Sequence, residues 1–133
     1  LYATTYGAIT HTANGLFWFS YNPDTYPTAW STLVDISLEL EDLSGALTAD
    51  TSPLQVSVSD PDVDTILKEY DGDLYLIAIN TKSTINNVDL TVSGVTATLA
   101  QVKFESRTEP IVSGTITDDF AYRQRHVYVF SAP

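Results

Sequence analysis

Residues Thr65–Ile79 read TILKEYDGDLYLIAI, which is the pattern of two β-strands joined by a tight turn. Thr65–Tyr70 and Leu74–Ile79 are rich in the aliphatic, β-branched and aromatic residues that strands favour. Asp71-Gly72 between them suits a two-residue turn, because that turn needs positive φ angles. The stretch therefore predicts an antiparallel β-hairpin.

Further strand candidates of similar length lie on both sides of this hairpin. They are separated by Gly, Pro, Asn and Asp, which favour turns. Short strands at regular spacing are typical of an all-β sandwich or barrel. We expect a mainly β fold, an antiparallel β-sandwich of seven to eight strands with one or two N-terminal helices. The other candidates are Leu54–Val58, Val88–Val92, Leu99–Phe104, Ile111–Ile116 and Val127–Phe130.

The N-terminal third of the chain predicts a helix followed by a buried strand. Apolar residues recur at helical spacing from Tyr2 to Ala13, and Asn14-Gly15 then offers a glycine for the helix C-terminus. Leu16–Tyr21, LFWFSY, is almost unbroken in apolar and aromatic residues. A strand that is apolar on both faces belongs in the middle of a sheet that helices cover. We expect that some of the neighbours of this strand lie outside this chain.

Residues 28–47 predict a second helix with one apolar stripe, which includes Trp30 and Leu33. Pro27 suits the first position of that helix, and Ser44-Gly45 lies near its end. No low-complexity linker follows, so we expect the helix to pack directly on the sandwich.

The composition excludes several classes of function. The formal charge is −11, from 17 acidic and 6 basic side chains, and this charge repels nucleic acid and anionic membranes. The chain has no cysteine, which excludes disulfides, thiolate metal sites and a cysteine nucleophile. No zinc spacing or phosphate-binding loop is present, so we expect no cofactor and no metal. The chain also has no methionine, and we interpret it as a processed product or an excised segment.

Several stretches of the chain together have the pattern of one known family. Near the N-terminus they are Tyr6–His11, Gly15–Tyr21, Trp30, Leu33 and Glu39–Leu43, and in the sandwich they are Asp71–Asn80, Val102–Arg107, Gly114–Phe120 and His126–Tyr128. In these stretches the chain resembles the C-terminal part of clan A glycoside hydrolases, retaining (β/α)8-barrel enzymes with a small C-terminal β-domain. Their motifs are patterns of shape more than of chemistry.

The resemblance implies a division of the chain into two parts. Residues 1–48 would be the end of the barrel, with the last barrel strand and helix, and residues 49–133 the C-terminal β-sandwich domain. In this family two carboxylates about 5 Å apart perform the chemistry, from barrel strands four and seven. Both would lie before Leu1, so we expect this chain to be inactive alone and to stabilise the barrel of a secreted or periplasmic enzyme. Its parent would act on a polysaccharide or oligosaccharide.

The resemblance also implies a role for aromatic residues at the end of barrel strand eight. Trp18 is at the position where many such enzymes stack a sugar, and Tyr21 would lie near the barrel mouth. The alternative is that Trp18 simply belongs to the core, as most buried tryptophans do. We name Trp18 and Tyr21 as the candidate substrate-binding residues and predict no catalytic residue.

Two other functions remain open. The chain could be an independent carbohydrate-binding module that uses surface tyrosines, with Tyr70, Tyr75, Tyr122 and Tyr128 as the candidates. It could also be an interaction domain, unrelated to sugars, that presents an acidic face to a partner. Under any of these functions we expect the isolated chain to self-associate through its exposed apolar N-terminal segment.

Other groups of polar residues have simpler explanations. The run Asp60–Asp64 has alternating carboxylates but lacks the glycine and glutamate of a calcium-binding loop. Glu105 and Glu109 give no sequence reason to converge, so we do not assign them a catalytic role. His126 is expected to be a half-buried residue of the last strand.

Overall fold

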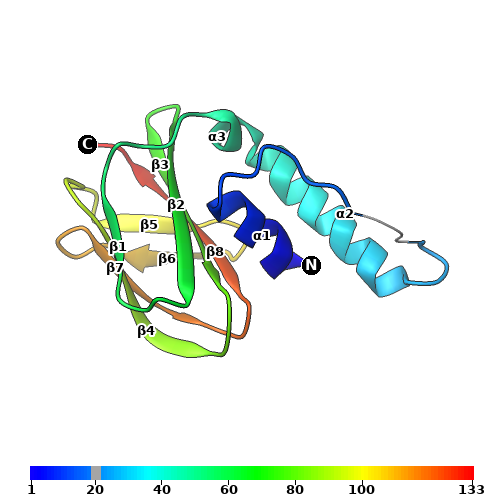
Figure 1. The fold of residues 1–133 in the computed structure, drawn as a ribbon. Coiled ribbons are helices and arrows are strands. Elements are labelled where there is room, and N and C mark those ends of the chain that lie inside the picture. Colours follow the sequence, from blue (N-terminus) through cyan, green and yellow to red (C-terminus); the bar gives the residue numbers. More distant parts are fainter. Residues whose placement is uncertain (19–21) are drawn as a thin grey trace.

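Two antiparallel sheets pack face to face, and helices cover the outer face of the larger sheet (Figure 1). The computed structural model describes residues 1–18 and 22–133. The helices in that part are α1 (Tyr2–Thr10), α2 (Pro27–Asp42) and α3 (Ser44–Thr48). The strands are β1 (Val56–Val58), β2 (Val63–Tyr70), β3 (Asp73–Asn80), β4 (Ile85–Val92), β5 (Leu99–Val102), β6 (Arg107–Pro110), β7 (Thr115–Phe120) and β8 (Arg125–Ser131).

The predicted hairpin forms one side of the five-stranded sheet, whose order is β2-β3-β8-β5-β6. Tyr70 pairs with Asp73, which leaves Asp71 and Gly72 as a two-residue turn with φ of 53° and 83°. Positive φ at both positions is the geometry that fits the twist of the flanking strands. The hairpin prediction is confirmed.

Strand β3 lies between two hydrophobic layers, which explains its continuous apolar sequence. Leu74, Leu76 and Ala78 face the smaller sheet, while Ile77 and Ile79 face the helices. All five side chains are fully buried. A strand covered on both faces has no polar side to present, so its alternation disappears.

The smaller sheet has the order β1-β4-β7 and closes the other side of the sandwich core. Val88, Leu90 and Val92 of β4 point inward, and Ile116 and Phe120 of β7 join them. The predicted fold class, a mainly antiparallel β-sandwich with N-terminal helices, is confirmed in the described part of the chain.

The predicted strand Ile111–Ile116 is wrong in its position. Val112 bridges Thr115 across a tight turn, in which Ser113 and Gly114 have φ of 52° and 79°. The turn reverses the chain, so β7 begins only at Thr115. The sequence analysis also missed β6, because this short edge strand is polar and ends in a proline.

Helix α1 ends before the predicted Asn14-Gly15 cap. Thr12 takes the left-handed conformation, with φ of 63°. Its amide donates to the Ile9 carbonyl at 2.9 Å, and the Ala13 amide donates to the Ala8 carbonyl at 3.0 Å. These two hydrogen bonds are the Schellman arrangement, which here uses threonine in the place that glycine commonly takes.

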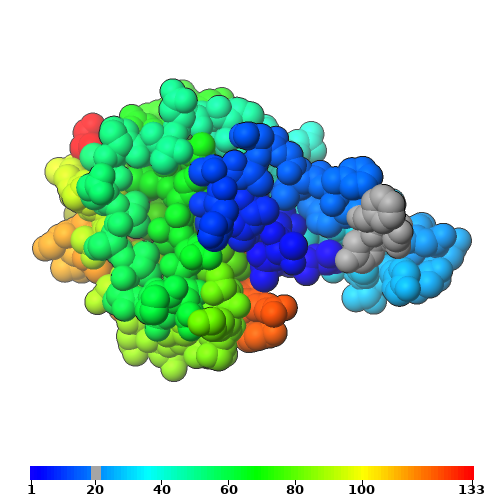
Figure 2. Space-filling model, viewed as in Figure 1, coloured from blue at the N-terminus to red at the C-terminus, as the bar shows by residue number. Residues whose placement is uncertain are grey.

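The predicted helix 28–47 is two helices, α2 and α3, which meet at Leu43. Pro27 begins α2 as expected, because its fixed φ suits a first helical position. The C-terminal part of α2 packs on the sheet side through Leu40 and Leu43. Its N-terminal part projects away from the sandwich (Figures 1 and 2).

Leu16–Trp18, predicted as the start of a buried strand, form no strand. Leu16 packs partly against the helix–sheet cluster, whereas the Phe17 side chain is 84% exposed. Neither sheet of the described part of the chain includes this stretch, so it lacks the strand partners that its apolar sequence predicts. The rest of the predicted strand, residues 19–21, lies outside the described residues.

Candidate functional site

Trp18, one of the two predicted site residues, lines a groove along α2. This groove, called the outer groove here, has a volume of about 370 Å³. The half-buried Trp18 comes from the chain before α2, and the other lining residues come from the helix itself. They are Trp30, Leu33, Val34, Ser37, Leu38 and Glu41. Tyr21, the second predicted site residue, lies outside the described residues.

Helical spacing explains why α2 presents an apolar stripe to the outer groove. Trp30, Val34 and Leu38 are four residues apart, so they lie along one side of the helix. Their exposed fractions are 44%, 44% and 58%. Ile36, on another side of the helix, and Leu43, which directly follows the helix, are fully buried. In the part of the chain that the structure describes, a row of large apolar side chains is therefore about half exposed to solvent.

Trp18 also lines a second groove, of about 720 Å³, which is bordered by the end of α1, by α3 and by β2. Its walls combine apolar residues with the polar side chains of Asn14, Asp50 and Lys68. The ammonium group of Lys68 donates to the Ala49 carbonyl at 2.8 Å. An aromatic ring beside an amide, a carboxylate and an ammonium group is a surface that can bind polar molecules.

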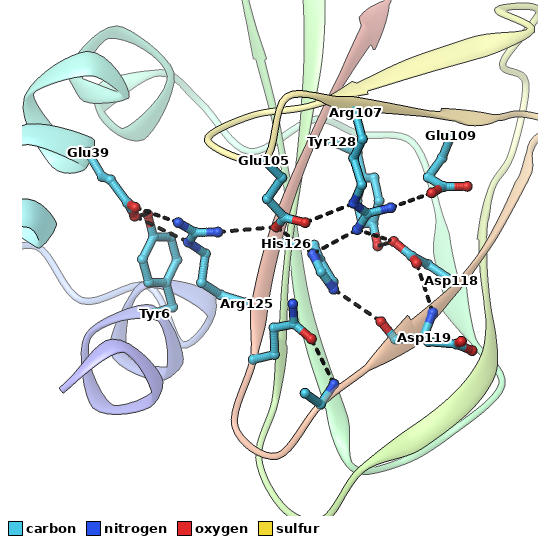
Figure 3. A network of polar contacts seen from close by, with 12 residues as sticks. Tyr6, Glu39, Glu105, Arg107, Glu109, Asp118, Asp119, Arg125, His126 and Tyr128 are labelled. Atoms are coloured by element: carbon cyan, nitrogen blue, oxygen red, sulfur yellow. Dashed lines mark hydrogen bonds and ion pairs between the residues drawn. The ribbon is translucent and has the colours of Figure 1, made fainter.

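A network of charged residues joins the helices to the five-stranded sheet (Figure 3). Glu39 of α2 accepts a hydrogen bond from Tyr6 of α1 at 2.6 Å. It also accepts two from the guanidinium group of Arg125 of β8, of which the Nε contact is 3.2 Å long. The Arg125 and Glu39 side chains are only 13% and 12% exposed. Two helices and a strand therefore meet at one largely buried ion pair.

Glu105 extends the network from Arg125 across the sheet. It lies in the turn between β5 and β6, and its Oε1 accepts from Arg125 at 3.2 Å. Its Oε2 accepts from the Nε of Arg107 at 2.9 Å. Arg107 also pairs with Glu109, and at 2.7 Å with Asp118, which accepts from the Tyr128 hydroxyl at 2.8 Å. Two arginines thus hold four carboxylates.

His126 is fully buried within this network and is hydrogen-bonded at both ring nitrogens. Its Nε2 lies 3.2 Å from the Asp119 carbonyl, which can only accept, so Nε2 carries a hydrogen. Its Nδ1 lies 2.6 Å from Glu105 and 3.1 Å from the Arg107 guanidinium. When the His126 ring is charged, its Nδ1 donates to Glu105, and when the ring is neutral, its Nδ1 accepts from Arg107. The sequence analysis expected half burial, whereas the side chain is enclosed on all sides.

Burial and neighbouring charges shift several pKa values in the network. Burial opposes ionisation of Glu105, but the hydrogen bonds and charges of His126 and Arg107 outweigh it and lower the pKa. The pKa of Asp118 is lowered in the same way, against burial, by Arg107 and Tyr128. Burial raises the pKa of Tyr6, and its hydrogen bond to Glu39 raises it further. Glu105 and Asp118 are therefore ionised and Tyr6 is neutral near pH 7.

This arrangement suits attachment of the helices better than catalysis. Glu105 and Asp118 have side chains 17% and 11% exposed, and each already pairs with an arginine. A carboxylate that acts as acid or nucleophile must reach a substrate. The two grooves beside Trp18 are lined by none of these network residues.

The sequence analysis missed this convergence. It found no reason for Glu105 and Glu109 to meet, yet both bind the guanidinium of Arg107. The available signal was Arg125-His126 at the start of a strand that is otherwise apolar. A buried charge requires a partner, so these two residues could have been marked for a search for carboxylates.

The four tyrosines considered for sugar binding do not form one surface. Tyr128 is fully buried, and Tyr75 is partly buried against the helix–sheet cluster. Tyr70 and Tyr122 are 46% and 62% exposed. Pairing places Tyr70 beside Asp73, at the opposite end of β3 from the loop that carries Tyr122. At the rise of an extended strand these ends are about 23 Å apart, too far for two rings to stack on adjacent sugars.

The acidic loop at residues 60–64 is explained by local contacts. The carboxylate of Asp60 accepts from the Asp62 amide at 2.9 Å, and Asp62 pairs with Lys82 at 2.6 Å. Within residues 1–18 and 22–133, no group of three or more acidic or histidine side chains is placed to hold a metal ion. No helix among the same residues has the length and apolar character needed to cross a membrane.

Within the described residues, fold and site together define a β-sandwich with an attached helical layer and a helix face that is apolar and partly exposed. No family model and no curated protein matches the chain. Among solved structures, it is similar to Gan42B, a GH42 beta-galactosidase, with 12% identity over 74% of this chain and a TM-score of 0.41. The matched region spans 12% of that chain. A likeness of this size does not assign a function.

Proposed function

We propose that this chain is an accessory C-terminal β-sandwich region of a glycoside hydrolase, which stabilises the catalytic barrel and is not catalytic alone. The sequence resemblance to clan A enzymes is the first support. In this proposal the parent is a secreted or periplasmic retaining enzyme, and residues 1–48 belong to the end of its barrel.

The observation that carries the proposal is the uncovered apolar face of α2. The sandwich core and the helix–sheet cluster each have a buried centre of apolar side chains. Trp30, Val34 and Leu38 remain exposed beside them. Rows of large apolar side chains on a protein surface mark contact with another protein layer. The rest of the catalytic barrel, packed on α2, would supply that layer.

The polar network supports the same arrangement. It fixes α1 and α2 to the sandwich through Glu39 and Arg125, so whatever packs on α2 is held firmly against the β-domain. In the parent enzyme, Trp18 and Tyr21 would contribute an aromatic surface to the substrate cleft.

The sequence of the gene tests the proposal directly. We expect the reading frame to contain, before Leu1, about 250 residues that alternate strands and helices, with two carboxylates at strand ends. Expression of that segment with and without residues 1–133 should give a soluble, active enzyme only when both are present. A reading frame that begins at Leu1 would refute the proposal.

An independent carbohydrate-binding module remains the alternative, and the polar groove beside Trp18 favours it. In this case the isolated chain should be retarded on native gels that contain a soluble polysaccharide. Lack of retardation on β-glucan, galactan, mannan and xylan gels would argue against this alternative and leave the accessory role unaffected.

A further inference from the structure

Helix α2 has large apolar residues on two sides, and the described part of the chain covers one of them. Ile36 and Leu43 are fully buried on the inner side, whereas Val34 and Leu38 are about half exposed on the outer side. A helix that is apolar on both sides is normally enclosed between two layers. Among the described residues, only Trp18 lines the outer groove from outside the helix, so this side lacks a full covering layer there.

The charges on α2 have one sign. Helix α2 contains four carboxylates and no lysine or arginine. Glu39 and Asp42 pair with Arg125 and Lys103. Within residues 1–18 and 22–133 the structure shows no ion pair for the other two, Asp35 and Glu41, and both are exposed. Glu41 lines the groove itself. A partner with positive charge beside its apolar surface would complement this side of α2.

The chemistry of the groove favours a protein helix over a sugar. Ser37 and Glu41 are the polar side chains among its lining residues, and the rest are apolar or aromatic. Sugar sites need several polar groups to satisfy the hydroxyls of the ligand. A helix buries its own backbone polar groups and can present a purely apolar stripe.

We propose that the outer groove binds an amphipathic α-helix that is not part of residues 1–133, with apolar side chains on Trp30, Val34 and Leu38 and lysine or arginine beside Glu41. Helix-in-groove binding uses apolar residues one turn apart, which matches the spacing of the α2 stripe. The inference rests on the proposed function only in naming the barrel as the source of that helix.

The two tryptophans of the chain make the inference measurable, because Trp18 and Trp30 both line the outer groove. The probe is a synthetic helical peptide of about four turns with a leucine stripe and lysine on both flanks. Its addition to the full chain should shift the tryptophan emission to shorter wavelength and saturate. The same peptide with glutamate on its flanks should bind about tenfold more weakly, because its flanks would then repel Glu41 instead of pairing with it.

Three variants distinguish groove binding from non-specific association. Leu38→Glu should abolish the saturable shift. Thr28→Glu places the same charge at an exposed position of α2 outside the groove lining, and should bind the peptide as the unchanged chain does. Glu41→Lys should reverse the preference between the two peptides. Each variant is checked for an unchanged circular dichroism spectrum before titration.

Several outcomes would overturn the inference. The first two are equal affinity for both peptides and peptide binding that persists in Leu38→Glu. The third is an emission shift that oligosaccharides produce and the lysine peptide does not. The fourth is a dimer of the chain, with micromolar affinity, that the lysine peptide does not displace. Failure of the peptide in a chain whose gene encodes a barrel would remove this inference and leave the proposed function standing. Binding of the peptide by a chain whose gene encodes no barrel would leave this inference standing and remove the proposed function.

Discussion

Removal of the Arg125 guanidinium tests whether the polar network holds the helices on the sandwich. In Arg125→Ala, Glu39 loses its ion pair, and Glu105 keeps only Arg107 and His126. The ring faces of Tyr2, Tyr6 and Phe104, which lie 5.2–5.7 Å from the guanidinium carbon, also lose a cation. The substitution leaves a nearly buried carboxylate between two helices and a strand.

The size of the effect follows from that burial. Glu39 is 12% exposed, so its charge is poorly solvated once the arginine is gone. Breaking a buried ion pair by removing one partner reduces stability by about 3–5 kcal/mol, most of it from the uncompensated charge. Because Glu39 keeps the hydrogen bond from Tyr6 and some access to water, we expect about 3 kcal/mol. The free energy of unfolding of a domain of this size is about 5–15 kcal/mol, so the variant should still fold.

Urea unfolding with two probes measures this effect. Circular dichroism near 217 nm reports on the sheets, and tryptophan emission reports on the helical part, because Trp18 and Trp30 both lie there. In Arg125→Ala the emission change should occur at lower urea than the loss of sheet. Glu39→Leu combined with Arg125→Met should recover most of the loss, since an apolar pair removes the unpaired charge.

The control is Arg123→Ala, which removes an arginine that forms no ion pair in the described part of the chain and contacts the exposed ring of Tyr122. It should change the free energy of unfolding by less than about 0.5 kcal/mol. Two results would refute the role assigned to the network. One is an equal loss of unfolding free energy in Arg123→Ala and Arg125→Ala. The other is a single transition for both probes in Arg125→Ala, with a loss of unfolding free energy below about 1 kcal/mol.

Three further predictions concern pH, backbone and association. The folded state lowers the pKa of Glu105 and Asp118, so their contribution to stability is present above the ordinary carboxyl pKa of about 4. This contribution is lost as the pH falls through the lower pKa values of the folded state. Urea unfolding between pH 7 and pH 3 should show the loss of stability, and the loss should be smaller in Asp118→Asn. Gly114→Ala should destabilise the protein by about 3 kcal/mol, because the φ of Gly114 is 79° and a Cβ would lie 2.6 Å from the Val92 carbonyl oxygen. Gly72→Ala, with φ of 83° and open space around the Cβ, should destabilise it by only about 1 kcal/mol. Equal losses of stability in thermal unfolding would contradict the clash at Gly114. The isolated chain should associate weakly at high concentration through the α2 stripe, as light scattering can measure, and Leu38→Glu should restore a monomer.

The hairpin and the sandwich could be predicted because local chemistry determines them. Asp71-Gly72 selects the tight turn, and Leu74–Ile79 is apolar enough to require cover on both faces. Leu16–Tyr21 is also continuously apolar and was predicted to be a strand covered on both faces, whereas Leu74–Ile79 was predicted only as one strand of a hairpin. An apolar run shows that a segment needs cover but not which neighbour supplies it, so this prediction failed for Leu16–Trp18.

The polar network could not be predicted, because its members are distant in sequence. Glu39 and Arg125 are separated by 86 positions, and neither has a neighbour that signals the other. Short-range rules find pairs three or four residues apart on a helix, or directly opposite in a hairpin. Arg107 and Glu109 fall under neither rule, because they lie two apart on one face of β6, and this strand was itself missed because it is polar and short.

The charge of the chain gives a reason for the way these pairs are placed. With 17 acidic and only 6 basic side chains, most carboxylates have no cation available and must stay in water. Arg107 and Arg125 nevertheless lie between layers, where together they bind four carboxylates. Buried pairs of this kind contribute little net stability compared with apolar residues, but they strongly disfavour arrangements that would leave a charge unpaired. The apolar contacts of Tyr6, Ile9 and Leu43 can therefore hold the helices on the sheet, while Glu39 and Arg125 select the one orientation in which the outer stripe of α2 faces away from the sandwich.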